Sequence, residues 1–210
     1  MIVRRLALAA ASLSLLGGLA LVGAPAALAQ MPAPNVIKDP KAAPAGLYKL
    51  DPRHASATVK LAHFGLSRYT LRFDTIAGEF TYDPAHPAAT QVSVTIDPKS
   101  VDTSDPKFNE EIADKFLDAG KYPTITFTST KIVLGAGDRG EVEGVLDFHG
   151  VKKPVTLHVT YRGFAEMMKQ QRMGFSGEAN FKRSDFGASS YVPVVGDEIT
   201  LLVEVEFAKQ

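Results

Sequence analysis

From about residue 46 to the C-terminus, apolar and polar residues alternate along most of the chain. A period of two places every second side chain on one face, which is typical of half-buried β-strands. Turn-forming residues separate these stretches at Asp83-Pro84, at residues 135–138 and at His149-Gly150. The predicted strands lie at residues 56–66, 69–82, 91–97, 125–129, 139–149, 155–161, 173–181 and 201–207. About eight strands in succession predict an all-β fold, namely a closed antiparallel β-barrel.

One segment has a helical period instead. Asp105 suits the N-cap of a helix and Pro106 its first position. Phe108, Ile112 and Phe116 follow at intervals of four residues and form one apolar stripe. We predict a short helix between strands that lies across a wall or a mouth of the barrel. It is either a plug that closes the barrel or a lid over a cavity, since loop excursions at barrel mouths serve both purposes.

The interior of such a barrel is either filled by side chains or open to one small ligand. The inward-facing rows combine aromatic with small residues, as in Phe175 beside Gly177 and Ala179, and in Phe148 beside Gly144. Small residues leave space for a ligand, but they also fit the taper of a filled barrel. The alternation pattern therefore leaves both possibilities open.

Residues 1–29 have the three marks of a secretory signal peptide. Arg4 and Arg5 supply a positive start, residues 6–28 are apolar, and the run ends in a small-residue cleavage site before Gln30. The apolar run is nearly long enough to span a bilayer, but glycines and a proline interrupt it. We therefore expect cleavage after Ala29, export, and no permanent membrane anchor.

The segment after the expected cleavage site differs in composition from the rest. Residues 30–45 contain four prolines and many alanines, which predicts a flexible linker. The folded domain is expected to span residues 46–210.

Charge and cysteine content exclude several classes of function. Without the signal segment and its two arginines, the chain contains 21 basic and 23 acidic residues, so its net charge is −2. This balance argues against nucleic-acid binding, which needs a basic face. The chain has no cysteine, which excludes disulfides, thiol nucleophiles and thiolate metal sites.

Several motifs, taken in chain order, resemble one family. They are Leu50-Asp51-x-x-His54, His63-x-Gly65, Phe73-x-x-Ile76-x-Gly78-x-Phe80, Tyr122-Pro123-x-Ile125-x-Phe127-x-Ser129, Val142-x-Gly144-x-Leu146, His149-Gly150-Val151, Lys182-Arg183-Ser184-Asp185-Phe186-Gly187 and Val195-Gly196-Asp197-Glu198. Together they are similar to the YceI-like family of periplasmic proteins, over about Tyr48 to Phe207. The chain departs from the family pattern at Tyr48, where tryptophan is common, and at Ala55, which separates His54 from Ser56. The resemblance implies a lipocalin-like barrel with a long apolar tunnel for a polyisoprenoid or another long-chain lipid, and no established catalytic activity.

The inward-facing rows of the predicted strands and the family motifs together predict which residues contact the lipid. They are Leu61, His63, Phe73, Ile76, Phe80, Ile125, Phe127, Leu146, Phe148, Leu157, Val159, Phe175, Phe181 and Val203. His63 is either a ligand contact or a paired structural histidine, and the second is favoured because buried polar groups are usually paired.

Lys182 and Arg183 are candidates for the lipid head group, since two cations at a barrel mouth suit a phosphate or carbonyl. The alternative, which we favour, is that Ser184 and Asp185 build the turn before Gly187.

No catalytic or metal site emerges from the motifs. The five histidines lack the spacing of zinc ligands, and neither a nucleophile elbow nor a His-Glu-x-x-His helix is present. We expect no metal and no cofactor other than a bound isoprenoid lipid or quinone.

The expected function is therefore non-enzymatic binding, sequestration or transport of a long-chain apolar lipid in the periplasm. The alternatives are a lipid-modifying enzyme and a filled barrel that serves as a structural or interaction module. The C-terminal strand and the helix stripe permit a homodimer without requiring one.

Overall fold

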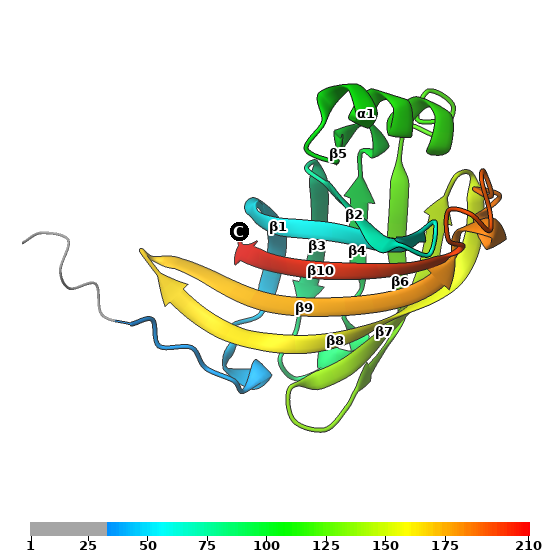
Figure 1. Cartoon of the computed structure of the whole chain (residues 1–210). Coiled ribbons are helices and arrows are strands. Elements are labelled where there is room, and N and C mark those ends of the chain that lie inside the picture. The colour runs from blue at the N-terminus through cyan, green and yellow to red at the C-terminus, as the bar shows by residue number, and fades with distance from the viewer. Residues whose placement is uncertain (1–32) are drawn as a thin grey trace, which may run out of the picture. The chain divides into compact units, whose positions relative to one another are not determined.

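The computed structural model describes residues 33–210. The expected signal peptide, residues 1–29, and the first residues of the expected linker lie outside this range. Within it, ten strands form one antiparallel sheet, of which eight close into a barrel (Figure 1). The strands are β1 (Gly46–His63), β2 (Ser67–Phe73), β3 (Ile76–Tyr82), β4 (Val92–Ile96), β5 (Val101–Asp102), β6 (Ile125–Leu134), β7 (Arg139–Phe148), β8 (Val151–Met167), β9 (Gln170–Lys182) and β10 (Glu198–Lys209).

The ring of the barrel closes through pairing of its first and last strands. The order around the ring is β1, β3, β4, β6, β7, β8, β9 and β10, and β10 then pairs with β1. β2 and β5 extend the sheet beside the second half of β1. The predicted all-β antiparallel barrel of about eight strands is confirmed.

β1 is longer than the predicted strand over 56–66, because it begins at Gly46. Its first half pairs with β3 and its second half with β2, while β10 runs along its other edge. Between Leu50 and Ala55 the register with β10 shifts, and Pro52 lies in this irregular stretch, where a missing N–H is tolerated. The predicted strand over 69–82 is two strands, since Asp74 and Thr75 separate β2 from β3.

The turn between β7 and β8 consists of two residues with left-handed backbone. His149 has φ 54° and Gly150 has φ 74°, as a tight hairpin requires. A Cβ on Gly150 would lie 2.4 Å from the Tyr122 ring, so glycine is needed here for space as well as conformation. This turn is at its predicted position.

The predicted helix is α1 (Pro106–Glu111), which continues into a π-helical turn, η5 (Ile112–Phe116). The Asp105 carboxylate caps it by accepting from the N–H groups of Lys107 and Phe108. Ile112 is buried in an apolar cluster with Phe73, Leu146 and Phe186, and Phe108 and Phe116 pack against that cluster. The apolar stripe therefore closes one end of the barrel, at the top in Figure 1.

The segment before β1 differs from the flexible linker expected over residues 30–45. Ile37 and Phe164 form an antiparallel bridge, with N–H to carbonyl distances of 2.8 and 2.9 Å. A 3₁₀ turn, η2 (Pro40–Ala42), follows, and Ala43 is fully buried. Residues 37–45 pack on the barrel because two buried tyrosines of the core donate hydrogen bonds to carbonyl groups of this segment.

Candidate functional site: the cavity inside the barrel

A cavity of about 410 Å³ lies inside the barrel, within the range of about 300–1,000 Å³ typical of small-molecule sites. All eight strands of the ring contribute to its lining, which consists mainly of apolar side chains. The hairpin between β6 and β7, which lies at the end of the barrel opposite α1 (Figure 1), contributes to the lining. Pro40 of η2 and Pro87 of η3 (Pro87–Ala89) also line the cavity.

Alternation along the strands explains why so many of the predicted contacts meet here. Nine of them line the cavity: Ile76, Phe80, Ile125, Phe127, Leu146, Leu157, Val159, Phe175 and Val203. Each occupies an inward position, and its neighbours in the sequence point outward, because the side-chain period of a strand is two.

Phe127 owes its position to a glycine on the neighbouring strand. A Cβ on Gly144 would lie 2.4 Å from Cζ of the Phe127 ring and 2.6 Å from the Thr128 carbonyl oxygen. Only the absence of a side chain on β7 lets the ring lie across this strand. The small residue noted in the sequence therefore accommodates an aromatic ring of the cavity wall.

The other five predicted contacts do not line the cavity. Phe73, Phe148 and Phe181 belong to the apolar cluster at the end covered by α1, where the rings of Phe148 and Phe181 lie 5.7 and 5.5 Å from that of Phe186. Leu61 is buried outside the cavity lining. His63 is exposed, with its ring 4.5 Å from that of Phe64. Alternation identifies an inward face but does not show how far along the barrel the packed end extends.

Lys182 and Arg183, which the sequence suggested as contacts for a lipid head group, are not part of the cavity lining. Lys182 is exposed, 3.8 Å from the Glu198 carboxylate. Arg183 is buried and donates to the carbonyl groups of Ala188, Ser190, Val195 and Gly196 at 2.6–2.8 Å. Its guanidinium therefore fixes the loop between β9 and β10 and is not placed to hold a ligand.

The alternative interpretation of this motif, a turn, agrees with the structure. The Ser184 N–H and hydroxyl both donate to the Asp197 carboxylate, at 2.9 and 2.7 Å. These bonds lower the pKa of Asp197. Gly187 then ends the 3₁₀ turn η6 (Arg183–Phe186) with φ 76°.

Several lining residues were not among the predicted contacts. Some lie on the same alternating rows and had that signal in the sequence: Val155, Tyr161, Met173, Gly177, Leu201, Val205 and Phe207. Others, such as Pro40, Pro87 and Thr90, lie in segments without a period, so no sequence pattern marks them.

Three buried tyrosines gather where the segment before β1 meets the barrel. Tyr48 and Tyr82 donate their hydroxyl hydrogens to the carbonyl groups of Pro44 and Pro40, at 2.8 and 2.9 Å. Burial raises the pKa of Tyr48 to about 12, and burial also raises the pKa values of Tyr82 and Tyr161. All three phenols therefore stay neutral at physiological pH.

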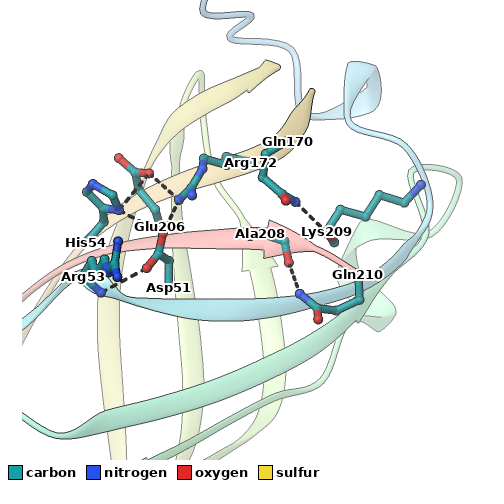
Figure 2. Close-up of polar contacts among 9 residues, drawn as sticks. All are labelled: Asp51, Arg53, His54, Gln170, Arg172, Glu206, Ala208, Lys209 and Gln210. Atoms are coloured by element: carbon teal, nitrogen blue, oxygen red, sulfur yellow. Dashed lines mark hydrogen bonds and ion pairs between the residues drawn. The ribbon is translucent and has the colours of Figure 1, made fainter. Parts of the chain in front are cut away.

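A polar cluster on the outer wall holds the irregular part of β1 (Figure 2). The Asp51 carboxylate accepts from Nη1 of Arg172 at 2.6 Å and lies 2.9 Å from the His54 ring, and Arg172 also reaches Glu206 at 3.1 Å. The bonds from His54 and Arg172 hold the pKa of Asp51 well below its usual range. The cluster ties β1 to β9 and β10 where the backbone ladder is interrupted.

This cluster makes part of the stability depend on pH. Because the native pKa of Asp51 is lowered, its contribution is complete above the ordinary value of 3.8 and is lost as the pH falls toward the native value. We expect Asp51→Asn to lower the free energy of unfolding by about 1–2 kcal/mol at pH 7, and by progressively less below about pH 4. Urea unfolding at several pH values measures this.

The exposed pair of Lys49 and Glu79, 3.7 Å apart, supplies the control. Glu79→Gln is expected to change stability by less than about 1 kcal/mol at any pH, as is usual for exposed ion pairs. A deficit in Asp51→Asn that stays constant between pH 7 and pH 3 would contradict the role assigned to the carboxylate.

Residues 33–210 show neither a metal-binding cluster nor a membrane-spanning helix. No group of three or more histidine, aspartate or glutamate side chains in this range is arranged to hold a metal ion. No helix in the same part of the chain is long and apolar enough to cross a membrane.

The fold and the cavity define the class: an eight-stranded antiparallel barrel with an apolar interior, an architecture shared with lipocalins. Comparison with known families then identifies the particular one. The chain belongs to the YceI-like domain family, whose model matches residues 48–207. The resemblance seen in the sequence motifs is thus confirmed.

Individual relatives agree with this assignment. A UPF0312 protein of Vibrio cholerae is 39% identical over 166 residues, covering 75% of this chain and 88% of the relative. The crystal structure of the Campylobacter jejuni YceI protein is 31% identical with a TM-score of 0.64, covering 71% of this chain and 90% of that one. A polyisoprenoid binding domain from Saccharophagus degradans shares the fold at 16% identity, with a TM-score of 0.60 and coverage of 78% and 98%.

Proposed function

We propose that this protein binds a long-chain apolar lipid, of the polyisoprenoid or isoprenoid quinone type, and sequesters or carries it without chemical change. The observation that carries the proposal is the 410 Å³ cavity with its apolar lining from all eight strands. Each CH₂ group moved from water into such a site contributes about 0.8 kcal/mol, so a prenyl chain binds tightly without covalent chemistry.

The likeness to the polyisoprenoid binding domain of Saccharophagus degradans supports this choice of ligand class by analogy of fold, while the apolar lining carries the argument from the site itself.

The composition of the lining argues against the alternative of a lipid-modifying enzyme. Among the described residues that line the cavity there is no histidine, lysine or cysteine. Ser176 is part of the lining, but its hydroxyl donates to the carboxylate of Glu204 and accepts from the guanidinium of Arg162, and both of these residues are exposed. A nucleophile needs an adjacent base within hydrogen-bond reach, and no such pair lines the cavity.

We further propose that the protein works in the periplasm after cleavage behind Ala29. The support is the positive start, the apolar run and the small-residue site in residues 1–29. An exported carrier would move a water-insoluble lipid across an aqueous compartment.

One preparation tests location and binding together. Protein isolated from the periplasmic fraction is expected to have the mass of a chain starting at Gln30 and to yield an intact isoprenoid lipid on organic extraction. Lipid that is altered on incubation would indicate an enzyme. Extracts without lipid, from protein that also fails to take lipid up, would indicate an interaction module.

Gly177 offers a way to fill the cavity without adding charge. It lines the cavity on β9, and a Cβ there would meet Leu157 and Val203 at 3.4 and 3.7 Å, which are ordinary contacts. Gly177→Leu is expected to reduce co-purified lipid at least fivefold while the barrel stays folded, because the new side chain occupies ligand volume. Quantitative mass spectrometry of extracts measures the change.

Glu178→Leu is the matched control, because Glu178 is the next residue on β9 and is exposed. It should retain wild-type lipid. Equal lipid in Gly177→Leu and wild type would place the ligand elsewhere.

A further inference from the structure

Two residues of the cavity lining have a buried hydroxyl group without a hydrogen-bond partner among the described residues. Both Tyr161 and Thr90 line the cavity. Their hydroxyl oxygens are shielded from solvent, and neither is bonded to any group within residues 33–210. Polar groups buried in native proteins are nearly always paired, so these two call for a partner from outside residues 33–210, which a bound ligand would supply.

The nearby tyrosines show that hydroxyl groups in this region are otherwise paired. Tyr48 and Tyr82 belong to the same apolar cluster as Tyr161. Their hydroxyls donate to carbonyl groups of the segment before β1. The hydroxyl of Tyr161 is left as a donor without an acceptor in the described chain.

The protonation state of Tyr161 suits it to donate. Burial raises its pKa, and the neighbouring Tyr82, Tyr48 and Asp39 raise it further. The phenol therefore keeps its proton, and it offers a ligand an O–H group without a charge.

The charged residues in the lining do not suit an anionic head group. They are Asp138, Arg139 and Glu141, in and beside the hairpin between β6 and β7. Arg139 is the one cation among the described lining residues, and it is exposed and directly follows Asp138. A phosphate drawn into this cavity would lose its hydration without gaining a buried cation, which is unfavourable.

We propose that the ligand has an uncharged polar head, whose carbonyl or hydroxyl oxygen accepts a hydrogen bond from Tyr161 and contacts Thr90. This inference rests on the lipid-binding function proposed above and narrows it. The ligand class is a prenol or a quinone-type lipid, and a prenyl phosphate is disfavoured. The polar end of the ligand then lies beside the segment before β1.

A pair of probes with the same tail tests the head group alone. Geranylgeraniol and geranylgeranyl phosphate share one C20 chain and differ in charge. Delipidated mature protein is expected to bind the alcohol at least tenfold more tightly than the phosphate in competition against radiolabelled geranylgeraniol. Equal or tighter binding of the phosphate would overturn the proposal while leaving the lipid-binding function intact. Failure of both probes to bind would overturn the two proposals together.

Tyr161→Phe tests the donor itself. It should weaken geranylgeraniol binding about 5- to 20-fold, as expected for loss of one hydrogen bond, and leave binding of the phosphate unchanged. Because the hydroxyl has no partner in the described chain, the melting temperature of the lipid-free protein should not fall.

Tyr48→Phe is the matched control. Tyr48 is not part of the cavity lining, and its hydroxyl donates to Pro44. This variant should lower the melting temperature and keep the ratio of alcohol to phosphate affinity within twofold of wild type. An unchanged ratio in Tyr161→Phe would remove Tyr161 from the head-group site.

Discussion

Phe127→Asp is expected to abolish lipid retention and to lower the free energy of unfolding by about 2–4 kcal/mol. Phe127 lines the cavity from β6, and its ring lies across the glycine at position 144 of β7. A carboxylate at this position would lose its hydration among apolar side chains and find no cation. Extraction with mass spectrometry measures the lipid, and urea unfolding measures the stability.

Thr128→Asp is the control for strand and charge together. Thr128 follows Phe127 on β6 but is exposed. It is a better control than Thr126, which faces Asp147 across the strand pair and would place two carboxylates side by side. Loss of lipid in Thr128→Asp, with retention in Phe127→Asp, would reverse the assignment of inner and outer faces.

Arg183→Met is expected to destabilise the protein by about 3–5 kcal/mol without directly removing a ligand contact. The guanidinium donates to four carbonyl groups of the loop between β9 and β10, and the side chain is 7% exposed. Methionine fills similar volume but leaves these carbonyls without donors. Chemical unfolding measures the loss, and lipid extraction at a temperature where the variant is folded should find wild-type lipid.

Two variants complete this experiment. Lys182→Met removes the neighbouring cation, which is exposed, and should change stability by less than about 1 kcal/mol. Arg183→Lys keeps the positive charge but not the planar set of donors, so it should recover only part of the stability that Arg183→Met loses. If Arg183→Met kept wild-type stability and lost lipid, the arginine would belong to a head-group site after all.

Local patterns in the sequence were sufficient for most of the strands, for the helix and for the inward face of the strands from β6 to β10, but not for the start of β1, the break between β2 and β3 or the exposed His63. Side-chain alternation in β6, β8, β9 and β10 reflects burial of one face, so it can be recognised without knowing the neighbouring strands. The helix start at Asp105 and the tight turn at Gly150 depend on backbone chemistry that only a few residue types satisfy. Nine predicted contacts line the cavity for this reason.

The tertiary structure alone decided where the cavity ends and what the polar residues do. Phe148 and Phe181 have the same alternation as the cavity residues, yet they pack with Phe186 under α1, because contacts between distant segments determine that end. Arg183 donates hydrogen bonds to carbonyl groups that lie up to thirteen residues away in the chain. The Tyr161 hydroxyl has no hydrogen-bond partner among the described residues. Segment 37–45 packs on the barrel through groups that Tyr48, Tyr82 and Phe164 supply. Such contacts depend on which segments meet in space and not on the spacing of residues along the chain, so they leave no periodic pattern from which the sequence could predict them.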